Sequence, residues 1–230
     1  MPGKHLYIIE IDCHMKGCIS LELQLAIDLL NKEEAAKLAK KVEEYVDIVE
    51  IGTPIVIYVG LPSVQHLNEN ISNAKVLADL KIMDAADYEV SQAVKFGADV
   101  VTILGVAEDA SIKAAVEEAH KHGKELLVDM IAVQDLETRA KELDEMGADY
   151  IAVHTGYDLQ AEGQSPLDSL RTVKSVIKNS KVAVAGGIKP DTIKDIVTEE
   201  PDLVIVGGGI ANADDPVEAA KQCRDAIEGR

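Results

Sequence analysis

The stretch from Lys75 to Asp84 (KVLADLKIMD) places two carboxylates and an ammonium group at the end of an apolar segment. Side chains of a β-strand alternate between its two faces, so a regular strand directs Asp79 and Lys81 to the same side. Charges at the end of a buried strand are costly unless they pair with one another, with a metal ion or with a substrate. The segment alone leaves two interpretations open: a structural ion pair, or part of a functional site.

Further polar side chains stand where other short apolar segments end, namely Asp28, Glu50, Asp129 and His154. Carboxylates that lie close together repel one another unless a cation or a proton lies among them. Glu50 and Asp79 supply the oxygen ligands that Mg²⁺ prefers, although neutralisation of one carboxylate by Lys81 is an alternative. Imidazole exchanges protons near neutral pH, so His154 is suited to proton transfer, with a purely structural histidine as the alternative.

Two glycine-rich turns follow the last two apolar segments, Ala185-Gly-Gly and Gly207-Gly-Gly. Glycine lets the backbone approach a ligand closely, and backbone N–H groups at the start of a helix attract anions. We therefore predict a phosphate site, with ordinary turn chemistry as the alternative. Its predicted residues are Gly186, Gly187, Gly207 and Gly208.

Eight short apolar segments, each followed by an amphipathic segment, position these residues. The predicted strands cover residues 23–28, 48–51, 75–80, 100–104, 125–130, 150–153, 181–185 and 203–206. The predicted helices cover residues 31–45, 61–70, 87–96, 109–122, 136–146, 167–178, 192–198 and 216–228. Strands that are apolar throughout are typical of parallel sheets covered on both faces, and strict alternation of strands and helices is typical of α/β folds.

An internal repeat distinguishes two α/β architectures. An apolar or small residue followed by aspartate precedes an apolar strand at intervals of about 50 residues, the length of two strand–helix units. The repeated pairs are Val46-Asp47, Ala98-Asp99, Ala148-Asp149 and Pro201-Asp202. Repetition by quarters favours a single-domain (β/α)8 TIM barrel over residues 21–230, with an open doubly wound sheet as the alternative. Because barrel enzymes carry their chemistry at the C-terminal strand ends, the polar side chains above converge on one mouth, which favours a functional site.

Composition excludes several classes of partner. The formal net charge of -18 disfavours binding to nucleic acid and to anionic membrane surfaces, which both require basic patches. No apolar run approaches the roughly 18 residues of a membrane span. Cys13, Cys18 and Cys223 form an odd, scattered set without the spacing of a disulfide framework, which is typical of a reducing cytoplasm.

The motif Asp79-Leu-Lys81-Ile-Met-Asp84 matches the D-x-K-x-x-D signature of the orotidine-monophosphate decarboxylase superfamily. Longer segments over about residues 21–228 resemble the hexulose-6-phosphate synthase family within it: LQLAIDLLN, VEIGTP, VLADLKIMDA, VTILG, VDMI, VHTGYDLQAEG, AVAGGIKPDT and VIVGGGI. The resemblance implies a reversible aldol reaction in which ribulose 5-phosphate and formaldehyde give a hex-3-ulose 6-phosphate. The implied cofactor is Mg²⁺, with Mn²⁺ as an alternative.

This chemistry fits the residues. Removal of a proton from C1 of the ketose phosphate leaves a 1,2-enediolate, whose negative charge needs neighbouring cations. We expect Glu50 and Asp79 to hold Mg²⁺, and Lys81 to add a second positive charge. We expect His154 to act as the base, and Asp28 and Asp129 to bind sugar hydroxyls, with Asp28 also among the catalytic residues. In this superfamily Asp84 commonly reaches into the neighbouring subunit's site, which implies a homodimer with shared sites.

Two alternatives remain at this stage. A 3-keto-L-gulonate-6-phosphate decarboxylase forms a similar enediolate by losing CO₂, but that family has an arginine where this chain has Tyr157, three residues after the histidine. It has another arginine where this chain has Gly208, which leaves the phosphate held mainly by backbone groups. The other alternative is a barrel without catalysis that serves as a binding or assembly module.

Residues 1–20 differ from the rest of the chain because they hold two of the three cysteines and precede the regular pattern. Chains of the synthase family typically begin with Met where this chain has Leu21. We therefore expect residues 1–20 to be a flexible leader, or to lie upstream of the native start with Leu21 encoded by a non-AUG initiator.

Overall fold

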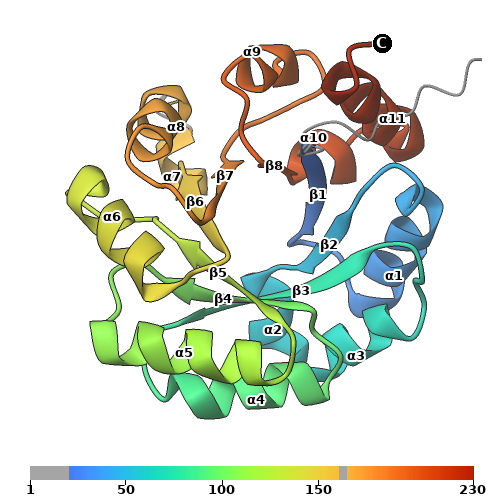
Figure 1. Ribbon diagram of the computed structural model, residues 1–230. Coiled ribbons are helices and arrows are strands. Elements are labelled where there is room, and N and C mark those ends of the chain that lie inside the picture. Colours follow the sequence, from blue (N-terminus) through green and yellow to red (C-terminus); the bar gives the residue numbers. More distant parts are fainter. Residues whose placement is uncertain (1–20, 161–164) are drawn as a thin grey trace, which may run out of the picture.

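The computed structural model describes residues 21–160 and 165–230, so the predicted leader lies outside the described residues. Within them, eight parallel strands close into a barrel in the order β1-β2-β3-β4-β5-β6-β7-β8 (Figure 1). The strands are β1 (Glu22–Ile27), β2 (Ile48–Ile51), β3 (Lys75–Ile82), β4 (Val100–Leu104), β5 (Glu125–Asp129), β6 (Tyr150–His154), β7 (Lys181–Ala185) and β8 (Leu203–Val206). The predicted (β/α)8 barrel is confirmed, and the open sheet is excluded.

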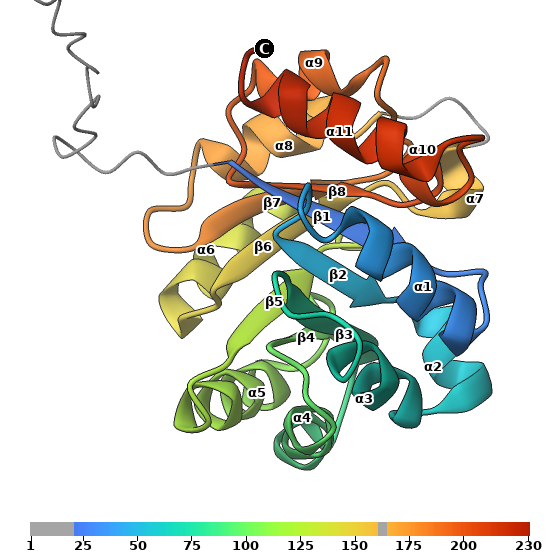
Figure 2. The same cartoon turned by 90° about the vertical axis from the view of Figure 1, so that its right-hand side faces the viewer.

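Helices surround the barrel and form its outer layer (Figure 1). They are α1 (Lys32–Val42), α2 (Thr53–Val59), α3 (Pro62–Asn68), α4 (Ala86–Lys95), α5 (Asp109–Lys121), α6 (Leu136–Met146), α7 (Tyr157–Gln160), α8 (Leu167–Lys174), α9 (Ile193–Val197), α10 (Gly208–Ala211) and α11 (Pro216–Ile227). We did not predict α2, α7 and α10, which have seven residues or fewer and thus no clear helical period. All three lie at the same end of the barrel, on the right of Figure 2. None of the helices in the described ranges is long and apolar enough to cross a membrane.

Strand side chains divide between two apolar cores. Leu23, Leu25 and Ile27 of β1 are fully buried in the core between the barrel and the helices, and each such side chain contributes roughly 1.5–3 kcal/mol. The alternate residues point into the barrel, whose interior is packed mainly with aliphatic side chains. These include Ile48, Leu77, Val100, Leu127, Ala183 and Leu203. Inward-facing residues beyond this packed interior are therefore free to line a site.

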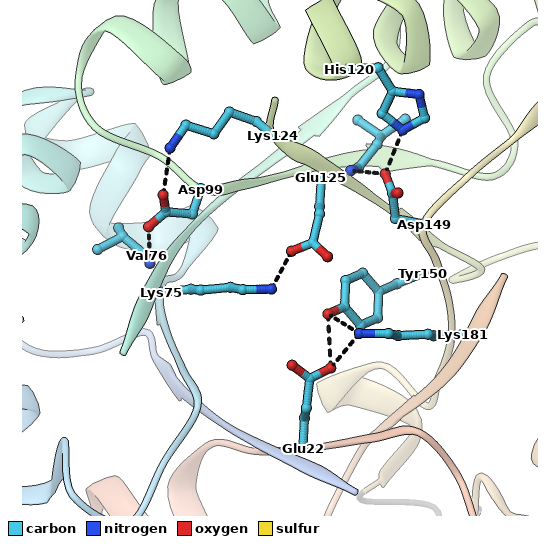
Figure 3. A network of polar contacts seen from close by, with 11 residues as sticks. Glu22, Lys75, Val76, Asp99, His120, Lys124, Glu125, Asp149, Tyr150 and Lys181 are labelled. Carbon is cyan, nitrogen blue, oxygen red and sulfur yellow. Dashed lines mark hydrogen bonds and ion pairs between the residues drawn. The ribbon is translucent and has the colours of Figure 1, made fainter. Parts of the chain in front are cut away.

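A ring of charged side chains closes the N-terminal end of the barrel. Its members come from β1, β3, β5 and β7 and point inward (Figure 3), where Lys75 pairs with Glu125 and Lys181 lies 2.9 Å from Glu22. The Tyr150 hydroxyl donates to Glu22 at 2.9 Å, and Lys181 Nζ lies 4.8 Å from the centre of the Tyr150 ring. Every charge in this ring has an opposite partner. The packed interior, in which Ile48, Leu77 and Leu203 are fully buried, separates the ring from the C-terminal end, where the mouth lies.

The repeated aspartates have a shared structural role. The carboxylate of each accepts the backbone N–H of a residue on the preceding strand at 2.7–3.0 Å, and the aspartate's own N–H donates to the carbonyl of that same residue. The pairs are Asp47 with Leu23, Asp99 with Val76, Asp149 with Leu126, and Asp202 with Val182. The repeat therefore marks how β1, β3, β5 and β7 are held at their starts, which Figure 3 shows for Asp99.

We predict that Asp99→Ala lowers the free energy of unfolding by about 1–2 kcal/mol, because the Val76 N–H and the Lys124 ammonium lose a charged acceptor. Asp99→Asn keeps a side-chain oxygen for Val76 and is expected to lose less. Urea unfolding followed by circular dichroism measures both. Asp168→Ala, at a side chain that is 96% exposed, is the matched control. Equal stability of Asp99→Ala and the wild type would contradict this role.

Candidate active site

The mouth of the barrel opens into a cavity of about 860 Å³, within the size range of small-molecule sites. Nearly all the predicted site residues line it, namely Asp28, Glu50, Asp79, Lys81, Asp129, His154, Gly186, Gly187, Gly207 and Gly208. Asp84 is the exception. Its carboxylate is exposed beyond the end of β3 and accepts the N–H of Ala85 at 2.8 Å.

β3 is irregular where it enters the cavity. Its register with β4 shifts between Ala78 and Ile82, and Lys81 adopts a left-handed φ of 47°. Such a backbone costs a non-glycine residue about 1–3 kcal/mol, and bulges of this kind redirect side chains beside active sites. The regular alternation from which we expected Asp79 and Lys81 to share a face is therefore absent. The two side chains meet because the bulge turns Lys81 into the cavity.

Lys81 is the cation among the acidic side chains of the cavity. Its Nζ lies 2.8 Å from Asp129 Oδ2 and 3.1 Å from Asp79 Oδ2. Burial alone lowers the pKa of an ammonium group, but the negative charges of Asp79 and Asp129 outweigh burial and raise the pKa of Lys81. The side chain is therefore protonated throughout the physiological pH range.

Asp129 orients His154. Its Oδ2 lies 2.9 Å from His154 Nδ1, and its Oδ1 accepts the N–H of Ile131 at 2.9 Å. Burial would raise the pKa of Asp129, but the hydrogen bond and charge of His154, together with the charge of Lys81, lower it to about 2. An ionised carboxylate only accepts hydrogen bonds, so Nδ1 of a neutral His154 carries the proton and Nε2 keeps a free lone pair. This is the tautomer that a general base requires.

Two threonines that we did not single out from the sequence hold Asp79. The Thr53 hydroxyl donates to Asp79 Oδ2 at 2.6 Å, and the Thr102 hydroxyl donates to Asp79 Oδ1 at 2.8 Å. Thr53 begins α2, and Thr102 lies in the middle of β4, the strand to which we assigned no site residue. A search for charged strand ends does not find uncharged hydroxyls. The available signal for Thr102 was a polar residue inside an otherwise apolar strand, VVTIL.

Glu50 lies deep in the cavity and is 8% exposed. The side-chain amide of Gln24, on the neighbouring strand β1, donates from Nε2 to Glu50 Oε2, whereas Gln24 Oε1 has no hydrogen-bond partner in the described structure. Burial and the negative charges of Asp79 and Asp28 raise the pKa of Glu50 well above its usual value. The cavity therefore holds more acidic groups than Lys81 alone neutralises.

These acidic groups fit the predicted divalent cation. Glu50 and Asp79 face the same cavity, and a cation beside both would relieve the repulsion that raises the pKa of Glu50. Residues 21–160 and 165–230 contain no group of three or more His, Cys, Asp or Glu side chains arranged as a complete ligand set. Two carboxylates, with water and substrate oxygens in the other positions, are the usual way in which Mg²⁺ is held. The donor set is thus suited to Mg²⁺ rather than to a structural metal.

The glycine loops after β7 and β8 form another part of the cavity lining. Gly186 has a φ of 121°, and a Cβ there would lie 2.7 Å from Thr155 O, so only glycine fits. Gly207 immediately precedes the short helix α10. Lys189 and Asn212, which we did not predict as site residues, also line the cavity. Backbone N–H groups, an amide and an ammonium group are therefore available to an anion on this side.

Comparison with known proteins agrees with this arrangement. Residues 21–223 match the orotidine 5'-phosphate decarboxylase / HUMPS family. The chain belongs to this family. A curated relative, the 3-hexulose-6-phosphate synthase of Staphylococcus haemolyticus (strain JCSC1435), is 94% identical over 210 residues, which cover 91% of this chain and all of the relative.

Two solved structures are similar to this chain over about nine-tenths of its length. The 3-hexulose-6-phosphate synthase from Salmonella typhimurium has a TM-score of 0.88 and 42% identity, covering 90% of this chain and 99% of that chain. The 3-keto-L-gulonate-6-phosphate decarboxylase from Vibrio cholerae has a TM-score of 0.80 and 25% identity, covering 91% of this chain and 98% of that chain. The TM-score and the sequence identity are both higher for the synthase structure than for the decarboxylase structure.

We predict that Glu50→Gln stabilises the protein in EDTA at pH 8 by about 0.5–2 kcal/mol, a usual gain when a destabilising site group is removed. Folding raises the pKa of Glu50, so the folded state keeps a proton that the unfolded chain releases. Wild-type stability therefore falls as pH rises from about 4 through the pKa of the folded state. The gain from Glu50→Gln should be large at pH 8 and small near pH 4.

Urea unfolding in EDTA at the two pH values measures this difference. Glu33→Gln, in the exposed first turn of α1, is the matched control and should change stability little at either pH. A Glu50→Gln variant that is less stable than the wild type at pH 8 would show that the carboxylate is not crowded by its acidic neighbours.

Proposed function

We propose that the protein is a lyase that reversibly joins formaldehyde to D-ribulose 5-phosphate, giving D-arabino-hex-3-ulose 6-phosphate through a 1,2-enediolate, with Mg²⁺ or Mn²⁺ as cofactor. One observation carries the proposal. The network of Lys81, Asp129 and His154 places an ammonium group near an imidazole with a free Nε2, in the cavity that the glycine loops also line. The synthase name of a relative that is 94% identical supports the choice of substrates.

The sugar phosphate binds with its phosphate at the loops after β7 and β8. Backbone N–H groups of these loops donate to the phosphate oxygens, and Lys189 adds a positive charge. The hydroxyl groups of the sugar face the acidic side chains. Asp28, at the rim, accepts hydrogen bonds from them, whereas three donors already occupy Asp129, which leaves it about one of its four acceptor sites. The main role of Asp129 is therefore to orient His154.

Proton transfer starts the reaction. His154 Nε2 takes a proton from C1 of the ketose, and Asp129 stabilises the resulting imidazolium through Nδ1. Negative charge then develops on the C2 carbonyl oxygen, and the Lys81 ammonium group stabilises it. Glu50 and Asp79 would hold the divalent cation, which would add positive charge beside this oxygen as a Lewis acid.

Carbon–carbon bond formation follows. C1 of the enediolate attacks the carbon of formaldehyde, and the electron pair of the C=O double bond becomes an alkoxide on the former aldehyde oxygen. This alkoxide takes the proton back from the His154 imidazolium, which restores the base. No atom leaves the reactants, so the same groups serve the reverse cleavage.

We predict that the purified protein consumes formaldehyde when ribulose 5-phosphate and Mg²⁺ are present, and that EDTA abolishes the consumption. Lys81→Ala is expected to lower kcat/KM by about 10²–10³-fold, because it removes a charge aimed at the developing enediolate. Aldehyde loss measured colorimetrically, with the hexulose phosphate identified by mass spectrometry, tests both expectations. Lys178→Ala, an exposed lysine outside the cavity lining, is the matched control.

The same assay distinguishes the alternatives. Faster release of CO₂ from 3-keto-L-gulonate 6-phosphate than consumption of formaldehyde would make the protein a decarboxylase. No turnover of either substrate, with Lys81→Ala indistinguishable from the wild type in every assay, would favour a binding module without catalysis.

We further propose that the protein forms a homodimer in which Asp84 serves the partner's cavity. Large apolar side chains are exposed around the end of β3, where α2 packs against the strand and α4 follows it. They are Ile57, Tyr58, Met83 and Tyr88, with 49–88% of each exposed. An exposed apolar patch of this kind marks an interaction surface, and Asp84 lies within it in sequence but outside its own cavity. A two-fold interface over this patch would cover the apolar side chains.

Mixing two inactive variants tests shared sites. If Asp84 acts in the partner's cavity, a hybrid of Lys81→Ala and Asp84→Ala subunits has one intact site and one doubly altered site. Random exchange of subunits is therefore expected to restore about a quarter of wild-type activity. Sedimentation checks the dimer, and wild-type protein taken through the same exchange is the control. No recovery from mixed subunits that do form dimers would place Asp84 in its own site or outside catalysis.

A further inference from the structure

The bulge of β3 lies opposite a single residue of β4. Ala78 pairs with Val101 and Ile82 pairs with Ile103, so three residues of β3 face only Thr102. Two of these three are Asp79 and Lys81, the acid and the ammonium of the cavity. The local geometry of both therefore depends on what Thr102 offers them.

Thr102 offers one hydroxyl, and both residues use it. Thr102 Oγ1 accepts the backbone N–H of Lys81 at 3.0 Å and donates its own proton to Asp79 Oδ1 at 2.8 Å. The residue is 3% exposed, so water does not readily replace either bond. The N–H bond restrains Lys81 in its left-handed conformation, and the O–H bond fixes the rotation of the Asp79 carboxylate.

We propose that Thr102 is a positioning residue for the reaction proposed above, on which this inference rests. Its hydroxyl fixes the β3 bulge, which holds the Asp79 carboxylate and the Lys81 ammonium group in fixed positions relative to each other. Thr102 lies in the cavity lining, but its hydroxyl is already engaged by Lys81 and Asp79. It acts through the two residues that it holds. Serine keeps a hydroxyl that can accept from Lys81 and donate to Asp79, whereas valine has the shape of threonine without the hydroxyl.

The position of Thr102 determines which kinetic constant should change. The glycine loops follow β7 and β8, whereas Thr102 acts on β3, so loss of its hydroxyl leaves the proposed phosphate site in place. Thr102→Val should therefore lower kcat about 100-fold, as misplaced catalytic groups do, and change KM for ribulose 5-phosphate by less than about threefold. Thr102→Ser should recover most of the loss.

A second readout does not depend on turnover. Since Asp79 is a proposed metal ligand, loosening its carboxylate should weaken binding of Mn²⁺ alone about tenfold, measured by electron paramagnetic resonance without substrate. Thr172→Val, at a half-buried position of α8 where the hydroxyl donates to the Asp168 carbonyl, makes the same exchange outside the cavity lining and should leave kcat and Mn²⁺ affinity unchanged. If Thr102→Val does not fold by circular dichroism, Thr102→Ala removes the hydroxyl without placing a second methyl group beside Asp79 and carries the test.

Two results would overturn the inference. One is a Thr102→Val protein with kcat and Mn²⁺ affinity within twofold of the wild type; the other is a Thr102→Ser protein as impaired as Thr102→Val, which would assign the loss to packing. The proposed function fails separately, when the wild type itself does not consume formaldehyde. In that case Mn²⁺ affinity of the three Thr102 variants still decides whether the hydroxyl positions Asp79.

Discussion

Crowded negative charge at the mouth of the barrel is the constraint on which the site depends. Glu50, Asp79 and Asp129 are each less than a tenth exposed, and they share one ammonium group, that of Lys81. Such crowding is unfavourable in the absence of further cations. The fold maintains it because these side chains stand on strands whose outward faces are packed against helices, so the acids cannot move apart without disrupting the core.

The two ends of the barrel differ in the balance of acidic and basic side chains. At the N-terminal end each acid pairs with one base, Glu22 with Lys181 and Glu125 with Lys75, so the net charge of the ring is zero. At the other end the same types of residue project from the same sheet, but acids outnumber bases. The difference between a structural end and a reactive end is therefore the imbalance of charge, not the presence of charged residues. The excess of acids at this end is the feature on which the proposed cation site rests.

Sequence analysis predicted most of the charged side chains that line the cavity, because parallel strands bring their C-terminal ends together whatever their spacing in the chain. Strand-end charges such as Glu50 and His154 were therefore predictable once eight strands were counted. The bulge at Lys81 was not, since it arises from pairing with β4, and regular alternation gave no hint of it. Thr102 and Gln24 were missed because uncharged side chains inside strands resemble ordinary strand polar residues. The role of the repeated aspartates also required the structure, because their partners lie on another strand.

The packed interior of the barrel has a consequence for how reactants reach the cavity. Because aliphatic side chains fill the barrel below the cavity, both reactants of the proposed condensation would enter through the C-terminal mouth. A bound sugar phosphate would extend from the glycine loops to the acidic side chains, whereas a one-carbon aldehyde would need little space. For the proposed reaction, one shared entrance favours binding of the sugar phosphate before the smaller aldehyde, and the single product would leave through the same entrance.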